Sequence, residues 1–178
     1  MDQDECWFSR FAQPQMHSWA EKGHELRLVE RQPAKNESGK ALACFGAVRQ
    51  DTKERFLYFA EGQPNSEHTI LMLKQLLEVA HKANKRVLVV IWDRASWHKS
   101  KQLMRWKWKH NQAAKRDDRV RLLTCLLPVK SPWLNPVEPH WVHAKRKIVE
   151  PDGELTAVEL KRRLCAHFQV DFSTATLQ

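Results

Sequence analysis

The sequence predicts an α/β protein built on a mixed β-sheet, and two observations carry this prediction. The first is an unbroken apolar run, Val87–Trp92, which is typical of a strand buried on both faces. The second is the order of the expected elements, in which short alternating segments come first and helices alternate with strands afterwards. The length of 178 residues favours one compact domain that spans residues 1–178.

The first expected elements are strands. Apolar residues partly alternate over 25–32, 41–50 and 55–60, as they do in strands with one buried face. The segment 33–39 separates the first two and contains a proline, an asparagine and a glycine, which favour turns. These two strands are therefore expected to form a hairpin.

A helix is expected next, over about 66–84, with Ser66 as its N-cap. Its apolar stripe consists of Ile70, Leu73, Leu76, Leu77 and Ala80. The buried strand then covers 86–93, and a basic helix follows at about 99–115.

The last third of the chain predicts one strand and two helices. The strand covers 121–127, and a proline-rich loop leads from it into a helix at about 136–149. Trp133 and Trp141 are expected to pack that helix against the sheet. A final amphipathic helix is indicated by Leu155, Val158, Leu160, Leu164 and Phe168.

Composition indicates which kind of partner the chain binds and where in the cell it lies. Lys and Arg number 30 against 21 Asp and Glu, a net charge of +9, which favours a polyanionic partner; surface lysines that only confer solubility are the alternative. The four cysteines are widely spaced, and Cys44 and Cys125 are expected to be buried free thiols. Without a signal peptide or an apolar stretch of about 18 residues, a cytoplasmic location with no membrane contact is expected.

Two carboxylates stand at positions that favour chemistry. Asp93 ends the buried strand, and ligands of open α/β sheets gather at that end of the strands. Asp93 could equally cap a turn or the next helix. Glu138 has an alternative too, because Asn135, Pro136 and Glu138 fit an N-cap, a first helical position and a capping box. Pro139 complicates that arrangement, and the helix could instead begin there.

A third acid is expected near the start of the chain. Asp2, Asp4 and Glu5 are all candidates, and spacing alone does not choose among them. Two or three converging carboxylates hold divalent metal ions, which serve in the cutting and joining of nucleic acid. Acids near a terminus are also common as plain solvated residues.

Two long blocks resemble a known family. Residues 93–100 read Asp-Arg-Ala-Ser-Trp-His-Lys-Ser, and 126–141 include Leu-Pro-Val-Lys-Ser-Pro-Trp-Leu-Asn-Pro-Val-Glu-Pro-His-Trp. These blocks resemble the catalytic domain of DDE transposases, in the bacterial insertion-sequence branch of the mariner-like superfamily. Asp4-Glu5-Cys6-Trp7-Phe8 and the segment 19–23 resemble the opening block of that family. The resemblance covers nearly the whole chain.

This resemblance implies a fold, a site and a reaction. It implies an RNase-H-like fold, a mixed five-stranded sheet flanked by helices. It makes Asp4, Asp93 and Glu138 the catalytic and metal-binding acids, holding two Mg²⁺ or Mn²⁺ ions. The implied reaction is DNA strand cleavage at the ends of an insertion element, followed by strand transfer. The implied partners are DNA, both terminal inverted repeats and target DNA, and a second copy in a homodimer.

Basic residues flank both of the later acids and are predicted to contact DNA phosphates. The predicted DNA-binding residues are Arg94, His98, Lys99, Lys101, Arg105, Lys145, Arg146 and Lys147. Solvated helix faces would give the same pattern, and His98 could also orient a phosphate or a water. Trp106 and Trp108 lie within the first run and are expected either in the core or at a stacking or dimer surface.

Three departures from the family pattern qualify this interpretation. Arg94 replaces the family's asparagine, and the polar segment 111–118 is expected to be an inserted loop. Asp4 lies so near Met1 that the strand carrying it is expected to be clipped. The family's helix-turn-helix DNA-binding domains are expected to be absent, which suggests a partial transposase. The alternative is a catalytically inactive remnant that binds DNA or oligomerises.

Overall fold

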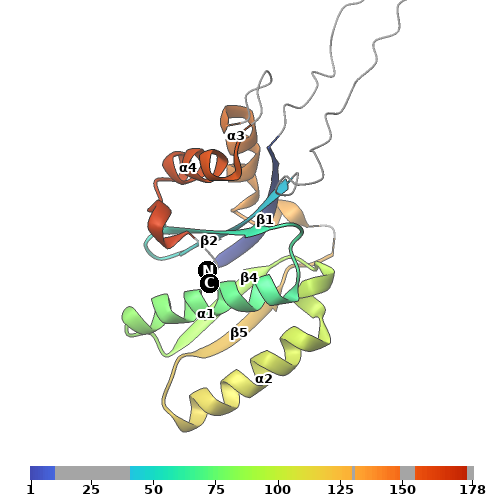
Figure 1. Cartoon of the computed structure of the whole chain (residues 1–178). Coiled ribbons are helices and arrows are strands. Elements are labelled where there is room, and N and C mark those ends of the chain that lie inside the picture. Colours follow the sequence, from blue (N-terminus) through green and yellow to red (C-terminus); the bar gives the residue numbers. More distant parts are fainter. Residues whose placement is uncertain (11–40, 130, 149–154, 176–178) are drawn as a thin grey trace, which may run out of the picture.

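The chain folds into a five-stranded sheet with helices on both faces. The computed structural model describes residues 1–10, 41–129, 131–148 and 155–175 (Figure 1). The strands are β1 (Asp2–Ser9), β2 (Ala41–Val48), β3 (Arg55–Glu61), β4 (Val87–Trp92) and β5 (Arg121–Leu126). The helices are α1 (Ser66–Lys82), α2 (Lys101–Arg116), α3 (Glu138–Ile148) and α4 (Ala157–Phe168), with short 3₁₀ helices at Ser96–Lys99, Pro132–Leu134 and Phe172–Thr174.

The sheet is mixed, with the strand order β3-β2-β1-β4-β5. The strands β1, β2 and β3 form an antiparallel meander, whereas β4 runs parallel to β1 and β5 runs parallel to β4. This confirms the mixed five-stranded sheet flanked by helices. Within the described ranges, no helix is long and apolar enough to cross a membrane.

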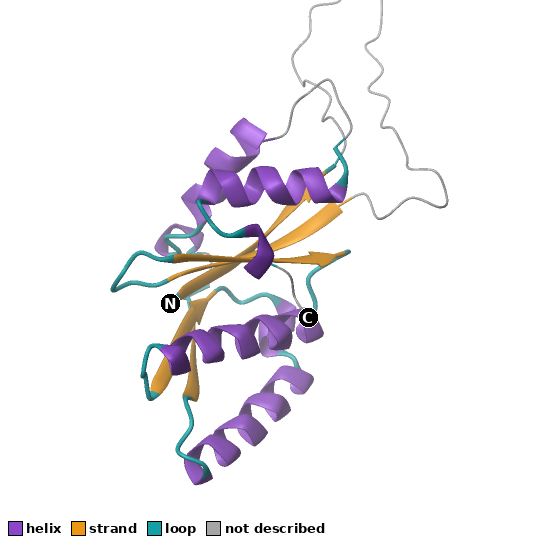
Figure 2. Ribbon diagram, turned by 60° about the vertical axis from the view of Figure 1, so that its left-hand side comes forward, coloured by secondary structure: helices purple, strands orange, loops and turns teal. Residues whose placement is uncertain are grey.

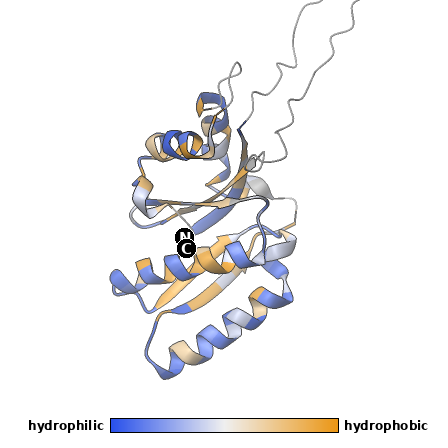
Figure 3. Cartoon of the chain, in the orientation of Figure 1, coloured by the Kyte–Doolittle hydropathy of each residue, from blue (hydrophilic) through white to orange (hydrophobic). Residues whose placement is uncertain are grey.

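Two apolar cores cover the two faces of the sheet, as the layers in Figure 2 show. On one face, alternate residues of β1, β2 and β3 pack against α3 and α4. On the other face, β2, β3, β4 and β5 pack against α1 and α2. Figure 3 shows the apolar strands β4 and β5 between α1 and a largely hydrophilic α2. The sheet therefore forms the middle layer of three.

The strand that carries Asp4, which was expected to be clipped, is β1, the central strand of the sheet. It occupies Asp2–Ser9 and pairs with β2 along its whole length, so the chain start is a full strand of the sheet. Its pairing with β4 is confined to Asp2 and Ile91. The strand expected at 25–32 and the hairpin turn at 33–39 lie outside the described residues.

Two local expectations were wrong. Asn65, not Ser66, caps α1, because its side chain accepts hydrogen bonds from the amides of Glu67 and His68.

The segment 111–118 is not a loop, since α2 continues to Arg116. Asn111 of α2 both accepts from the Leu122 amide (2.8 Å) and donates to its carbonyl (2.9 Å). A side-chain amide therefore pairs with the outer edge of β5, whose backbone groups would otherwise lack a strand partner.

The face of β4 and β5 that lies opposite α1 and α2 is less covered. Leu123 is 54% exposed and Cys125 is also exposed, so the expectation of a buried thiol at Cys125 was wrong; Cys44 is buried as expected. The reason is positional: α3 and α4 cover β1 to β3 and do not reach the edge strand β5.

The tryptophans divide between core and surface. Trp141 is buried and packs edge-to-face on Phe8, whereas Trp133 is 74% exposed and does not pack α3 against the sheet. Trp106 packs against the α1 and α2 core, while Trp108 is 63% exposed.

Gly46 allows the close approach of α3 to the sheet. A Cβ atom added there would lie 2.5 Å from Trp141 Cζ2 and 2.6 Å from Cη2, closer than such atoms approach. Trp141 therefore lies directly over the Gly46 backbone of β2, beside Asp4, which pairs with Gly46 across β1 and β2.

We expect Gly46→Ala to lower the free energy of unfolding by about 1–3 kcal/mol, because the new methyl group overpacks this contact. Urea denaturation of the variant measures the loss. Trp141→Phe removes the ring atoms that clash, so adding it to Gly46→Ala should cost less than the sum of the two single changes. Additive losses would contradict a direct contact between the two positions.

Candidate active site

The register between β1 and β4 brings two carboxylates together. Asp2 of β1 pairs with Ile91 of the parallel strand β4; Asp4 lies two residues after Asp2, and Asp93 lies two residues after Ile91, directly after the end of β4. The Cβ direction repeats every two residues along a strand, so both side chains point to the face that packs against α3. Asp4 and Asp93 accordingly line one cleft of about 360 Å³.

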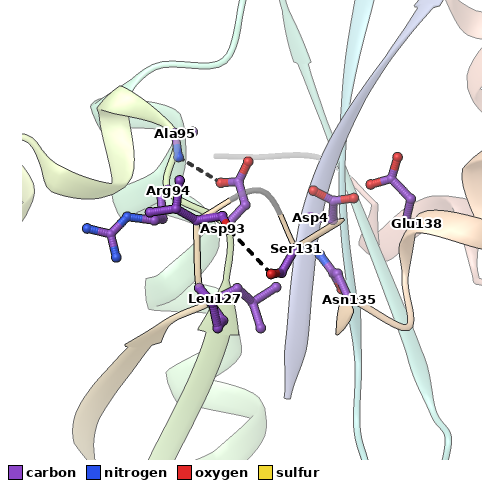
Figure 4. A pocket seen from close by; sticks show the side chains of 10 residues that line it. Asp4, Asp93, Arg94, Ala95, Leu127, Ser131, Asn135 and Glu138 are labelled. Atoms are coloured by element: carbon purple, nitrogen blue, oxygen red, sulfur yellow. Dashed lines mark hydrogen bonds between the residues drawn. The ribbon is translucent and has the colours of Figure 1, made fainter. Parts of the chain in front are cut away.

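Glu138 joins them from the first position of α3. The loop before the helix is tied to β1, because the side-chain amide of Asn135 donates to the Gln3 backbone carbonyl (3.1 Å). Asn135 Oδ1 also accepts from the Val137 amide (3.2 Å), which closes the turn that leads into the helix. Figure 4 shows the Glu138 carboxylate beside that of Asp4 and away from Asn135. Glu138 thus faces the cleft rather than completing a capping box.

The cleft has two parts, which differ in their lining residues. One is lined by Arg94, Ala95, Leu127, Pro128, Val129, Ser131 and Asn135. Beyond the acids it continues into a hollow of about 400 Å³ that includes Trp7, Trp97, Trp141 and Lys145. Asp4, Asp93 and Glu138 line both parts and therefore lie at their junction.

Asp4 occupies the most strained electrostatic position of the three. Its residue surface is 7% exposed, and the Trp141 indole donates to its Oδ2 (3.1 Å). Burial, and then the negative charges of Glu5, Glu138 and Asp93, raise the pKa of Asp4 to about 8. A cation between these oxygens would offset both effects, and a set of carboxylate oxygens is the donor chemistry that Mg²⁺ and Mn²⁺ prefer. The residues present therefore fit a divalent metal site.

Asp93, unlike Asp4, lies where its charged form is stabilised. Its Oδ1 accepts from the Ala95 amide (2.9 Å) and lies 2.8 Å from His98 Nδ1. The hydrogen bond from His98 is the main cause of a lowered pKa for Asp93. Burial lowers the pKa of His98, but its bonds to Asp93 and Glu5 outweigh burial and raise it to about 9.

Of the predicted basic residues, Arg94 and Lys145 line the cleft and its hollow. Arg94, Lys99, Lys101, Arg105, Lys145, Arg146 and Lys147 are all exposed. Figure 4 shows the Arg94 guanidinium directed away from the three carboxylates, so it does not neutralise them in this conformation.

His98 does not fit the DNA-contact role predicted for it. Its side chain is 0% exposed, and both ring nitrogens are engaged, one by Asp93 and the other by Glu5. No ring nitrogen remains for a phosphate. Sequence reasoning also missed that Trp141 and Ala95 bind the acids, because these contacts join segments far apart in the chain or use a backbone amide.

A comparison with models of protein families supports the family resemblance described from the sequence. The model of the family described as DDE superfamily endonuclease matches residues 3–154, most of the chain. The chain belongs to this family. A comparison with curated protein sequences gives no match.

Solved structures with the same fold include several Mos1 transposase complexes. The Mos1 strand transfer complex matches with a TM-score of 0.56 at 15% identity, over 97% of this chain and 48% of that chain. The Mos1 paired-end complex with the left transposon end gives 0.58 at 15% identity, over 96% and 47%. The Mos1 mariner paired-end complex with Mn gives 0.55 at 15% identity, over 96% and 48%. The DDE superfamily chain thus has the RNase-H-like fold and spans about half the length of these Mos1 chains.

The strained position of Asp4 predicts a pH-dependent effect on stability. An acid whose folded pKa is raised from 3.8 to about 8 leaves stability unaffected below pH 3.8 and costs progressively more up to pH 8. We therefore expect Asp4→Asn, without metal, to raise Tm by several degrees more at pH 8 than at pH 5. Thermal melts in EDTA at both pH values measure this. Glu78→Gln, which removes an exposed carboxylate of α1, is the control, and an equal gain for Asp4→Asn at both pH values would contradict the cause.

Proposed function

We propose that this chain is the catalytic domain of a DDE transposase from the insertion-sequence branch, which cuts and joins DNA with the help of divalent metal ions. The observation that carries the proposal is the convergence of Asp4, Asp93 and Glu138, from β1, the end of β4 and the start of α3, on one cleft. The resemblance described from the sequence assigns these three residues to the acids of the family motif. The family match over 3–154 contains all of them.

The chemistry follows from what the residues hold in place. When bound, two Mg²⁺ or Mn²⁺ ions supply activation of the attacking oxygen and stabilisation of the leaving oxygen in an in-line displacement. Asp4, Asp93 and Glu138 would hold them. The Ala95 amide and His98 fix Asp93, the Trp141 indole fixes Asp4, and the tie between Asn135 and Gln3 fixes the start of α3.

In the proposed reaction the DNA strand is cut by water at the end of the element. Water attacks the phosphorus, the bond to the 3′-oxygen breaks, and a free 3′-hydroxyl is left. That hydroxyl then attacks a phosphorus of target DNA in the same cleft and displaces a 3′-oxygen there. The partners proposed are therefore the terminal inverted repeats and the target DNA, encountered in the cytoplasm at the nucleoid.

The exposed cations around the cleft support DNA as the partner. Lys99, Lys101 and Arg105 lie after Asp93, and Lys145, Arg146 and Lys147 lie along α3 after Glu138. Such groups neutralise phosphates without reading the sequence. The Mos1 neighbours include paired-end complexes, and we propose by analogy that two copies of this chain act together as a homodimer.

The central test is nicking of supercoiled plasmid by the purified chain with Mn²⁺. We expect Asp93→Asn and Glu138→Gln each to lower the nicking rate about 100-fold or more, because each removes a metal ligand. Glu78→Gln should nick as the wild type does. Full activity in both cleft variants would refute the site, and DNA binding by an inactive wild type would instead favour a non-catalytic DNA-binding domain.

The role of the cations on α3 predicts a change in salt dependence. A variant with Lys145→Gln, Arg146→Gln and Lys147→Gln should bind random duplex more weakly. Its slope of log affinity against log salt should shrink by about 0.9 for each phosphate that the variant no longer neutralises. Fluorescence anisotropy at several salt concentrations measures both.

The matched control changes Lys82, Lys85 and Arg86 to glutamine. These exposed cations lie just before β4, at the end of that strand opposite to Asp93. They should contribute little to binding. Equally weakened binding in the two triple variants would show that only net charge matters.

A further inference from the structure

His98 bridges two carboxylates from two strands. It belongs to the 3₁₀ helix Ser96–Lys99, directly after Asp93. Its Nδ1 lies 2.8 Å from Asp93 Oδ1, and its Nε2 lies 2.9 Å from Glu5 Oε1. Ionised carboxylates only accept hydrogen bonds, so both ring nitrogens act as donors in this arrangement.

The imidazole ring is itself immobilised. It stacks on Trp92 with ring centroids 4.3 Å apart and planes 6° apart, and the Trp97 ring meets it edge-on at 6.0 Å. Trp92 is 1% exposed, so the ring rests on the core between the sheet and α1 and α2. Because the ring is fixed by packing, the carboxylates that are hydrogen-bonded to it are fixed as well.

The bridge crosses the sheet where its backbone pairing is weakest. Glu5 pairs with Phe45, whose side chain is part of the α1 and α2 core, so Glu5 lies on the face opposite to Asp4. β1 and β4 pair at Asp2 and Ile91, and β4 ends at Trp92. Beyond that point, the chain Glu5–His98–Asp93 is a side-chain link between the strand of Asp4 and the loop of Asp93.

Asp93 gains a fixed orientation from this link. Half of its side-chain surface is exposed, which by itself would leave the carboxylate free to rotate. Within the described residues, the hydrogen bonds to its carboxylate from His98 and Ala95 both end on Oδ1. That leaves Oδ2 as the oxygen available to a ligand in the cleft.

We propose that His98 is a positioning residue of this site, which fixes the Asp93 carboxylate and its spacing from Asp4 by binding Glu5 on the other face of the sheet. The proposal rests on the proposed function, since it concerns how the acids are set up to hold metal. Partners that orient metal ligands typically contribute 10–100-fold to metal affinity, and this is the size of effect expected here.

A metal ion held by Glu5, Asp93 and His98 is the competing explanation, because their ligand atoms lie within 4.8 Å of one another. The N···O distances of 2.8 and 2.9 Å are those of hydrogen bonds. In a tetrahedral site, two ligands that each lie about 2 Å from one metal ion would be about 3.3 Å apart, further than this. The geometry favours a bridging proton on each side.

The test compares His98→Gln with His110→Gln. His110 is a matched control, since it also stacks on a tryptophan, Trp106, and also uses a ring nitrogen, 2.9 Å from the Val120 carbonyl, but it lies away from the acids. The first readout is the Mn²⁺ concentration that gives half of the maximal rise in Tm. His98→Gln should raise it about 10-fold or more, whereas His110→Gln should lower Tm without moving it. Affinity for DNA without metal should stay unchanged in both.

The second readout tests the bridge without metal. Glu5→Leu removes the acceptor, and Glu5→Gln keeps an acceptor oxygen. In EDTA, the double variant of His98→Gln and Glu5→Leu should melt close to the less stable single variant, because both break the same link. Glu5→Gln should retain most of the wild-type Mn²⁺ response, which a purely charge-based role would not allow.

The outcomes separate this inference from the proposed function. An unchanged Mn²⁺ midpoint in His98→Gln, with wild-type protein that binds Mn²⁺, overturns the positioning role alone. Additive losses of Tm in the double variant would show that His98 and Glu5 do not form one link. Weaker DNA binding by His98→Gln, with an unchanged Mn²⁺ midpoint, would indicate that His98 contacts DNA instead. Wild-type protein that neither gains stability from Mn²⁺ nor nicks DNA overturns the proposed function, and the positioning role with it. Loss of a Zn²⁺ response in Glu5→Leu would favour the competing metal site.

Discussion

The pairing of β1 with β4 is the contact on which the site depends. Asp2 opposite Ile91 sets the register, and that register places Asp4 beside Asp93 where β4 ends. A slip of one residue would turn Asp4 to the other face of the sheet, into the core under α1, because side chains alternate along a strand. Glu138 depends on the same strand, since Asn135 holds the start of α3 to the Gln3 carbonyl. One strand thus controls the positions of all three acids.

The two faces of the sheet have opposite electrostatic roles at this point. On the α3 face, Asp4 is buried among acids, and its charged form is disfavoured. On the α1 face, His98 lies between Glu5 and Asp93 and favours the charged form of Asp93. Asp93 takes part in both arrangements, because it stands in the loop beyond the end of β4. It can therefore stay ionised next to Asp4, where a carboxylate without a cationic partner would tend to become protonated.

Sequence reasoning placed what local pattern determines and missed what long-range pairing determines. Asp93 follows an apolar run and Glu138 follows a proline-rich block, so their neighbourhoods indicate them. β1 carries three acids in its first four residues, and its partner β2 begins 32 residues after it ends, which no periodicity reveals. Glu5 and His98 are 93 positions apart, and their contact comes from the sheet. Asn111 was expected in a loop because it is polar, yet its amide is satisfied by the β5 backbone.

Charge also explains why metal and DNA should depend on each other in the proposed function. Exposed cations such as Lys99 and Lys145 attract phosphates to the rim of the cleft, but the carboxylates within it repel them. A phosphate can approach Asp4 closely once a divalent cation offsets these negative charges. The same cation relieves the repulsion that raises the pKa of Asp4. Metal binding therefore recovers free energy that the folded chain loses when it keeps these acids together without metal. The cost of keeping the acids together without metal and the affinity of the cleft for metal are therefore two consequences of one arrangement.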